Sequence, residues 1–270
     1  MYTETRSNFR LHKICVLIPT YNNAQTLEQV VNDALRYTDQ VIVVNDGSTD
    51  GTSAILEKFP NLRKVSYDKN RGKGYALRTG FAFALAEGFD YAITMDSDGQ
   101  HFAADLPSFL NVLNENPESI IIGARNMDQS TVPGKSSFGN KFSNFWFWVT
   151  TGIRMDDTQS GYRWYPIRRM RNINFFTRKF EFEIEVLVRS SWIGIPVKSI
   201  PVEVFYPEKG KRITHFRPFK DVTRITILNT VLVFAALLYI KPRDAWRSLK
   251  KKTSDNSFES NCLTPPNQTH

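Results

Sequence analysis

The chain has 270 residues, of which 41% are hydrophobic, 23% charged and 13% aromatic, as is typical of globular domains. With only two cysteines, Cys15 and Cys262, it is not a disulfide scaffold, and its aromatic content excludes a mainly disordered chain. The formal net charge of +8 is unevenly distributed, because residues 1–150 carry −2 and residues 151–270 carry +10. A basic second half suits nucleic acid, a membrane surface or a phosphorylated substrate.

The first half of the chain predicts an α/β fold with a mostly parallel sheet flanked by helices. Short apolar runs, typical of buried parallel strands, alternate with segments of helical spacing. The expected strands are residues 14–18, 41–44, 62–66, 91–95 and 119–123, and the expected helices are residues 26–37, 50–59, 72–88 and 104–114. Ligands of such sheets bind beyond the carboxyl ends of the strands, so these ends should carry the site.

The pattern is less regular after residue 124. Residues 126–140 are polar and include Pro133 and Gly134, which predicts a mobile loop. The elements expected after it are an aromatic segment at 142–149, a turn and short strand at 158–165, a helix at 182–192 and a strand at 197–206.

One segment, residues 225–240, is apolar enough to meet lipid. It is uncharged and lies between Arg224 and Lys241. A membrane-spanning helix needs about 20 apolar residues, and this segment is shorter and contains three polar side chains. It is either a buried core helix or a helix that lies in, or marginally spans, a membrane. The basic residues at both ends favour the membrane.

Each of the five expected strands is followed by a polar segment. These segments carry acidic, basic, amide and glycine residues of the kind that bind ligands. In chain order these segments are residues 19–23 (PTYNN), 45–52 (NDGSTDGT), 70–74 (NRGKG), 96–101 (DSDGQH) and 123–125 (GAR). Each segment alone could be a solvated turn or a helix cap. Five of them in order, at the edge where ligands bind, indicate a site.

The most specific of these segments contains Asp96 and Asp98. They lie two residues apart at a strand end, so both carboxylates can point the same way. Carboxylates this close repel unless a cation lies between them, and Mg²⁺ or Mn²⁺ prefers such oxygen ligands. Gln100 is a candidate third ligand. The alternative is a polar turn that caps the next helix.

Neighbouring segments suit a diphosphate. Arg71 and Lys73 are cations of the kind that bind phosphate, and the glycines beside them allow close backbone approach. Asp46, at the second strand end, is placed to hydrogen-bond a ribose or a base. Together with the metal site, these residues imply a metal-bound nucleoside diphosphate as ligand.

The motifs IPTYNN, VVNDGSTDGT, NRGKGYALRTG, MDSDGQH and DTQSGYR, in this order, resemble the family 2 glycosyltransferases of the GT-A fold. The likeness covers roughly residues 13–206 and is strongest to the branch that transfers sugars to dolichyl or polyprenyl phosphate, such as dolichol-phosphate mannosyltransferases. It implies an inverting, metal-dependent enzyme that takes a sugar from a GDP- or UDP-linked donor. The expected acceptor is a polyprenyl (dolichyl-type) phosphate lipid.

The resemblance also assigns residues. In that family the PTYN turn and the aspartate of NDGS bind the nucleotide, and the DxD-type motif holds the metal with a glutamine two residues on. With the cations added, the expected nucleotide-binding residues are Pro19, Thr20, Tyr21, Asn22, Asp46, Arg71, Lys73 and Asp96. The expected ligands of Mg²⁺ or Mn²⁺ are Asp96, Asp98 and Gln100.

The acceptor decides the role of Asp157. An aspartate at this place is the general base in relatives with hydroxyl acceptors, whereas a lipid phosphate is already anionic and needs no base. A third possibility is a structural aspartate that caps the turn at 158–161. The expected catalytic residues are Asp98, Asp157, Arg125 and Arg163, and the expected acceptor-binding residues are Ser160, Glu183, His215 and Arg217.

Two further patterns bear on the acceptor side. Glu183 and Glu185 lie two apart on an expected helix, so one should face the acceptor pocket and the other the surface. Five aromatic residues crowd one segment, and we expect half of them in the core and the rest against lipid. They are Phe142, Phe145, Trp146, Phe147 and Trp148.

The expected domains are an N-terminal extension at 1–12 without the features of a signal peptide, a catalytic domain at 13–206, a basic and apolar membrane-associating segment at 207–241, and a polar, disordered tail at 242–270. Basic residues surround the acceptor side and the apolar helix, which favours an anionic membrane surface. We therefore expect the enzyme on the cytoplasmic side of a membrane, peripheral or with a single short C-terminal anchor.

Two other functions compete with this one. The first is a glycosyltransferase of the same fold whose acceptor is a saccharide or another lipid hydroxyl and whose base is Asp157. The second is a nucleotide or nucleic-acid binding module that uses the positive charge. The spacing of basic and aromatic residues matches no RNA-binding signature, so no nucleic-acid partner is expected. The sugar, the base of the nucleotide and the oligomeric state are left open.

Overall fold

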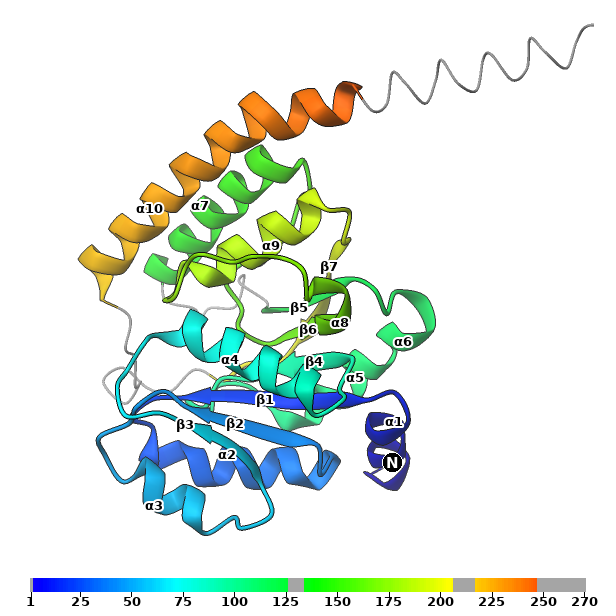
Figure 1. Cartoon of the computed structure of the whole chain (residues 1–270), viewed down its shortest axis with the longest axis vertical. Helices are drawn as coiled ribbons and strands as arrows, with labels where there is room; N and C mark the ends of the chain where they lie inside the picture. The colour runs from blue at the N-terminus through cyan, green and yellow to red at the C-terminus, as the bar shows by residue number, and fades with distance from the viewer. Residues whose placement is uncertain (1, 126–133, 206–216, 247–270) are drawn as a thin grey trace, which may run out of the picture.

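The computed structural model describes residues 2–125, 134–205 and 217–246, and its core is one seven-stranded sheet (Figure 1). The strand order is β3-β2-β1-β4-β6-β5-β7. β6 is antiparallel to β4 and β5, and all other pairs are parallel, which confirms the expected sheet. The strands are β1 Ile14–Thr20, β2 Val41–Asn45, β3 Arg63–Ser66, β4 Tyr91–Thr94, β5 Ile120–Arg125, β6 Arg163–Tyr165 and β7 Val197–Val202.

Helices cover both faces of this sheet (Figure 1). In the first half they are α1 Tyr2–Leu11, α2 Ala24–Tyr37, α3 Thr52–Glu57, α4 Lys73–Ala86, the 3₁₀-helix η1 Ala103–Asp105, α5 Leu106–Leu110 and α6 Val112–Glu115. In the second half they are α7 Gly134–Thr151, α8 Ile167–Met170, α9 Phe182–Trp192, α10 Pro218–Ala235 and the π-helix η2 Ala236–Ile240.

β1 shows why these residues form a central strand. All seven of its residues are buried, as expected for a parallel strand with helices on both faces. Ile14, Val16 and Ile18 face one hydrophobic cluster, which α2 and α5 complete. Cys15 and Leu17 face the other, which α4 and α9 complete. The apolar run therefore packs against both hydrophobic clusters, one on each face of the sheet.

Three sequence predictions need correction. The helix expected at 104–114 is divided into η1, α5 and α6, and asparagines at 111 and 116 end the last two pieces, because asparagine competes for backbone hydrogen bonds. The loop expected at 126–140 is wrong for 134–140, which belong to α7. Residues 126–133 lie outside the described part of the chain. The strand expected to begin at 197 is regular only to Val202.

The residues before the sheet are not a separate arm. Residues 2–11 form α1, which packs on α2 and β1, and its Phe9 is fully buried in the α2 side of the core. Arg10 of α1 is ion-paired with Asp39, which follows α2. The N-terminal extension therefore contributes to the core of the sheet domain.

The apolar segment near the C-terminus lies on the outside. α10 runs beside α7, with α9 beneath them (Figure 1), and a continuous helix extends over Phe219–Trp246. By length and composition this helix could cross a membrane, and it is longer than the segment expected at 225–240. Only 22% of its apolar window is buried. The segment is therefore not a buried core helix.

Candidate active site

The carboxyl ends of β1, β2 and β4 meet at one edge of the sheet, as predicted. β1 lies between the other two, and Thr20 pairs with Asn45 at the end of β1 and β2. The residues after these strands, and those that the neighbouring loops bring to them, form the candidate site.

The PTYN turn is fastened to the loop after β2. Asn22, which has a left-handed φ of 50°, donates its backbone N–H to Ser48 Oγ (3.0 Å), and its Oδ1 accepts from Thr49 N (2.7 Å). Pro19 and Thr20 are buried in β1, whereas Tyr21 is half-buried. The buried Thr20 Oγ1 has no hydrogen-bond partner among the residues that the structure describes, which suits a group that awaits a ligand.

Asp46 organises the phosphate-loop candidate. It is 3% exposed, and its carboxylate accepts from the backbone N–H groups of Arg71 and Gly72 (both 2.8 Å) and from Asn70 Nδ2 (3.0 Å). Gly72 has a φ of 102°, which a glycine adopts without strain. Asp46 thus fixes the loop in front of α4, and its contact with a ribose or base stays a prediction.

Arg71 rests on an aromatic pair that the sequence patterns did not indicate. Its guanidinium lies 4.8 Å from the ring of Tyr75 and 5.6 Å from that of Tyr67, and it donates to the Tyr75 hydroxyl (2.6 Å). The two rings meet edge to face at 5.6 Å. This stack holds an exposed arginine in one orientation at the site edge.

Lys73 lies between the candidate metal carboxylate and the acceptor side. Its ammonium is 2.7 Å from Asp96 Oδ1 and 2.9 Å from Glu183 Oε1. Burial opposes the charge of Lys73, but both carboxylates outweigh it and its pKa lies above the usual value. Burial likewise opposes ionisation of Asp96, yet Lys73 holds the pKa of Asp96 below its usual value. Both groups are therefore charged at neutral pH.

The residues after β4 fit a divalent metal through oxygen ligands. Asp98 is half-buried, its Oδ1 accepts from the Gln100 backbone N–H (3.1 Å), and Gln100 is buried. Among the residues that the structure describes, no group of three or more His, Cys, Asp or Glu side chains could hold a metal. Two carboxylates are nevertheless sufficient for Mg²⁺ or Mn²⁺ when substrate phosphates and water complete the shell.

Gly161 leaves the space in which this carboxylate lies. A Cβ at this position would be 2.6 Å from Asp96 Oδ2 and 2.9 Å from Lys73 Nζ. Both contacts are to the ends of side chains, which can move, so an added methyl group would displace the site more than the fold. The SGY turn thus contributes a glycine that the sequence reasoning did not assign.

We expect Gly161→Ala to lower turnover by at least about tenfold, because the methyl group pushes Asp96 and Lys73 from their positions. The free energy of unfolding should change by less than about 1 kcal/mol, since flexible groups give way. Steady-state kinetics and thermal unfolding measure the two effects. The matched control is Gly139→Ala, whose Cβ would meet nothing closer than 3.7 Å. Unchanged turnover in Gly161→Ala would show that the space left by Gly161 beside Asp96 and Lys73 does not matter for the reaction.

His101 is a second residue that lacked an assigned role. Its side chain is 6% exposed, its ring lies 5.0 Å from that of Tyr162, and its Nε2 is 4.0 Å from Asp96 Oδ2. Burial lowers the pKa of His101 to about 4, so the imidazole is neutral at pH 7. Its position directly after DSDGQ was the available signal.

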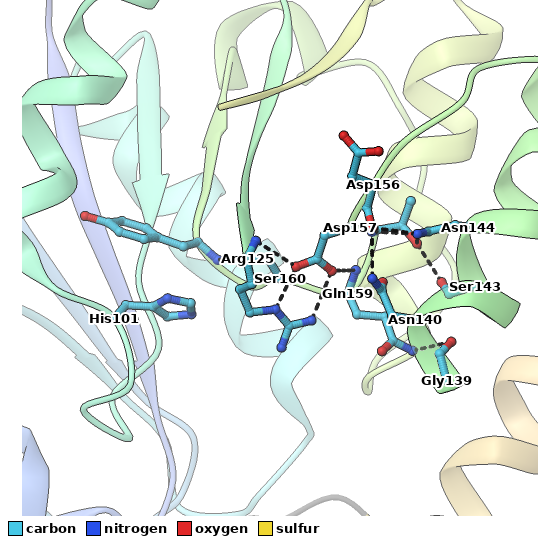
Figure 2. Close-up of polar contacts among 12 residues, drawn as sticks. His101, Arg125, Gly139, Asn140, Ser143, Asn144, Asp156, Asp157, Gln159 and Ser160 are labelled. Atoms are coloured by element: carbon cyan, nitrogen blue, oxygen red, sulfur yellow. Dashed lines mark hydrogen bonds and ion pairs between the residues drawn. The ribbon is translucent and has the colours of Figure 1, made fainter. Parts of the chain in front are cut away.

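Asp157 and Arg125 form a buried ion pair at the end of β5 (Figure 2). Arg125 Nε is 2.6 Å from Asp157 Oδ2, and its Nη2 is 3.0 Å from Oδ1. Asp157 is fully buried, and its Oδ1 also accepts from the Gln159 N–H (3.0 Å). Burial alone would raise the pKa of Asp157, but the bonds from Arg125 hold it below its usual value. The carboxylate is thus engaged as an ion-pair partner and turn cap.

Arg163 and Ser160 do not lie where an acceptor could meet them. Arg163 is fully buried in β6 and donates to the carbonyls of Ser160, Thr158 and Glu183 (2.6, 2.9 and 2.8 Å). Ser160 is 1% exposed, and its Oγ accepts from the Tyr162 N–H (3.3 Å). We therefore correct both assignments: these residues brace the turn before β6.

The remaining acceptor-side residues are divided. Glu183 contacts Lys73, and its place in an acceptor pocket stays a prediction, but Glu185 is not on the surface, as one glutamate of the pair was expected to be. It is 1% exposed and accepts from the backbone N–H groups of Phe176 and Thr177 (3.0 and 2.9 Å), which orders the loop before α9. Arg217 is exposed and donates its N–H to Asp221 Oδ2 (2.7 Å) at the start of α10. His215 lies outside the described residues.

The basic loop before α9 closes over the phosphate-loop candidate. The carbonyl of Arg178 accepts from the Tyr75 N–H (2.8 Å) in the first turn of α4. A Cβ at Gly72 would meet that carbonyl at 2.7 Å, and one at Gly74 would meet the Lys179 carbonyl at 2.7 Å. Both glycines are therefore required by this contact, which brings two basic residues to the donor side of the site.

The mostly parallel seven-stranded sheet, with helices on both faces and carboxylates beyond its strand ends, is the GT-A fold of glycosyltransferases. The family model of Glycosyl transferase family 2 matches residues 15–185, so the chain belongs to this family of glycosyltransferases.

Among its relatives, the chain is 28% identical over 267 residues to dolichyl-phosphate beta-glucosyltransferase of Homo sapiens, with 87% of this chain and 78% of the relative covered. It is 25% identical over 217 residues to UDP-N-acetylglucosamine--dolichyl-phosphate N-acetylglucosaminyltransferase of Methanococcus voltae, with 72% and 86% covered.

A solved structure with the same fold is glucosyl-3-phosphoglycerate synthase from Mycobacterium tuberculosis in complex with Mn²⁺, UDP and phosphoglyceric acid. The TM-score is 0.64 at 18% identity, with 87% of this chain and 82% of that chain covered.

Proposed function

We propose that this enzyme transfers a sugar, with inversion, from a nucleoside-diphosphate sugar to a polyprenyl phosphate. The observation that carries the choice of acceptor is the buried pair of Asp157 and Arg125. A hydroxyl acceptor needs a general base, and a buried carboxylate with a lowered pKa, held by arginine, is a poor one. A phosphate acceptor is already anionic and needs no base.

On the donor side, Asp96 and Asp98 would hold Mg²⁺ or Mn²⁺. The cation supplies Lewis-acid stabilisation of the charge that develops on the diphosphate leaving group. Asp46 holds the loop at 70–72 in place, and Lys73 adds a positive charge beside Asp96. The names of the relatives support this donor and acceptor class, since two of them name a dolichyl phosphate and one a UDP-linked sugar.

The surface of α7 and α10 supports a membrane-bound acceptor. On α7, Phe142, Phe145 and Trp148 are 40%, 51% and 42% exposed, whereas Phe147 is buried. Asn140, Ser143 and Thr150 are also buried on α7, so most of its inward side chains are polar, the reverse of an ordinary soluble helix. The large apolar side chains exposed on α10 and η2 are Phe219, Val222, Ile227, Val231, Phe234, Leu237, Leu238 and Tyr239. We place this surface, the outer apolar surface, against the cytoplasmic face of an anionic membrane.

Replacing Phe234 and Leu238 together by Asp should reduce co-sedimentation with anionic vesicles by at least about tenfold, because two charges would enter the lipid interface. The two side chains are 59% and 76% exposed, so the fold should be unaffected. The matched control is Leu11→Asp on α1, a 72% exposed leucine far from α10 (Figure 1). Equal vesicle binding of both variants would mean that the outer apolar surface does not contact lipid.

A donor panel tests the proposed reaction. Purified enzyme is incubated with GDP-mannose, UDP-glucose or UDP-N-acetylglucosamine, each with Mg²⁺ or Mn²⁺ and dolichyl or undecaprenyl phosphate. We expect radiolabel from one donor to enter the lipid fraction. Donor hydrolysis without a lipid product from any donor would contradict the proposal.

A further inference from the structure

The turn that carries Asp157 is held from one side by α7. Asn144 of α7 donates through Nδ2 to the carbonyl of Asp156 (2.7 Å), and its Oδ1 accepts from the Thr158 N–H (2.9 Å). One side-chain amide thus pairs with the backbone on both sides of Asp157 (Figure 2). Because a backbone N–H can only donate and a carbonyl can only accept, this pairing fixes the orientation of the amide.

Neighbouring side chains of α7 reinforce this contact. Asn140 Nδ2 donates to the same Asp156 carbonyl (2.9 Å), and the hydroxyls of Thr158 and Ser143 are hydrogen-bonded to each other (2.8 Å). The Thr158 hydroxyl is also 2.7 Å from Asn144 Oδ1. Asn140, Ser143 and Asn144 thus hold the turn from the inward side of α7. Among the residues that the structure describes, Asn144 alone of this helix bonds through its side chain to the backbone on both sides of Asp157.

We propose that Asn144 is a positioning residue for the transfer reaction. It holds the turn at 156–158 so that Asp157 grips Arg125 at the end of β5, and Arg125 is thereby fixed beside the acceptor phosphate. The helix that supplies Asn144 also carries the ridge of Phe145 and Trp148 on the outer apolar surface. Asn144 therefore fixes the position of the Arg125 guanidinium relative to the outer apolar surface, from which a lipid phosphate would arrive. The inference rests on the proposed acceptor.

The test begins with Asn144→Ala and its matched control Asn172→Ala, an exposed asparagine in the loop after α8. With a short-chain, water-soluble polyprenyl phosphate, kcat/KM for the acceptor should fall about 10- to 100-fold in Asn144→Ala, as expected when two hydrogen bonds that hold the turn are lost. Calorimetric affinity for the nucleoside diphosphate should stay within about twofold of wild type. The control should match wild type in both measurements.

Thr158→Val is a second variant that preserves side-chain shape, so it guards against loss of the fold. It removes the hydroxyl bonds to Ser143 and Asn144 and leaves the backbone bond intact, so a smaller loss in the same acceptor parameter is expected. A general structural role would instead lower the thermal midpoint and weaken nucleotide binding along with turnover. That pattern, or acceptor kinetics unchanged in Asn144→Ala, would overturn the inference.

Hydrogen exchange separates this inference from the proposed function, because it needs no substrate. In Asn144→Ala the amides of Thr158 and Gln159 should exchange at least about tenfold faster than in wild type, while the strands of the sheet keep their protection. Unchanged exchange at these amides would overturn the positioning role. If exchange accelerates but wild-type enzyme uses no lipid phosphate, the proposed function fails while Asn144 is still shown to hold the turn.

Discussion

Asp96→Asn is expected to lower turnover by about 10²- to 10³-fold or more, since it removes a carboxylate from the metal site and the partner of Lys73. Lys73 retains Glu183 at 2.9 Å, so the fold should survive the substitution. Steady-state kinetics gives the loss of rate, and Mn²⁺ titration by electron paramagnetic resonance gives the loss of metal affinity. Both should change together.

The matched control for this variant is Glu57→Gln, the same change of carboxylate to amide on the exposed side of α3. It should retain wild-type turnover and Mn²⁺ affinity. If Asp96→Asn kept turnover within about twofold of wild type at saturating metal, the role given to the residues after β4 would be wrong.

The second large effect concerns Arg125 and Asp157. Arg125→Gln leaves the fully buried Asp157 without its cation, and breaking a buried pair in this way costs about 3 to 5 kcal/mol of unfolding free energy. Turnover should fall as well, because the guanidinium that we propose to meet the acceptor phosphate is lost. Urea unfolding and acceptor kinetics measure the two losses separately.

The double variant Arg125→Gln/Asp157→Asn tells these effects apart. Two neutral amides can hydrogen-bond to each other, so most of the lost stability should return. Turnover should stay low, since the positive charge is still missing. If activity returned together with stability, Arg125 would serve only to compensate Asp157. If Asp157→Asn alone abolished transfer while the fold and donor binding were intact, Asp157 would be a catalytic base.

The strand-end site could be predicted because its signals are local. Each polar segment follows a short apolar run, and parallel strands bring their carboxyl ends together whatever the details of packing. Asp46, Asp96 and Asp98 therefore lie where the sequence placed them. The ends of the helices could not be predicted as well, because asparagines and tertiary contacts decide where a helix stops.

The contacts that could not be predicted join distant segments. Glu183 reaches Lys73 only because α9 packs beside α4, and the Arg178 carbonyl caps α4 from another loop. Arg163 was misplaced because alternation along a three-residue strand does not tell which side chain points inward. In the structure its guanidinium points inward and donates to the backbone carbonyls of Ser160 and Thr158.

α7 was partly misread for a related reason. Its first residues are polar and contain glycine, which in a soluble protein indicates a loop. In the structure the polar residues Asn140, Ser143 and Asn144 face the protein, where the turn at 156–158 satisfies them. Phe142, Phe145 and Trp148 of the same helix face outward, whereas Phe147 is buried. A helix of this kind can be recognised only when the backbone groups that hydrogen-bond to its inward polar side chains are known.

The most direct test of the central claim compares two acceptors that differ only in their head group. Wild-type enzyme, its preferred donor and Mg²⁺ or Mn²⁺ are incubated with dolichyl phosphate or with dolichol of the same chain length. We predict lipid-linked sugar from the phosphate and none from the alcohol, because Asp157 is engaged by Arg125 and no base is required for a phosphate. Efficient transfer to dolichol, abolished by Asp157→Asn, would contradict this account.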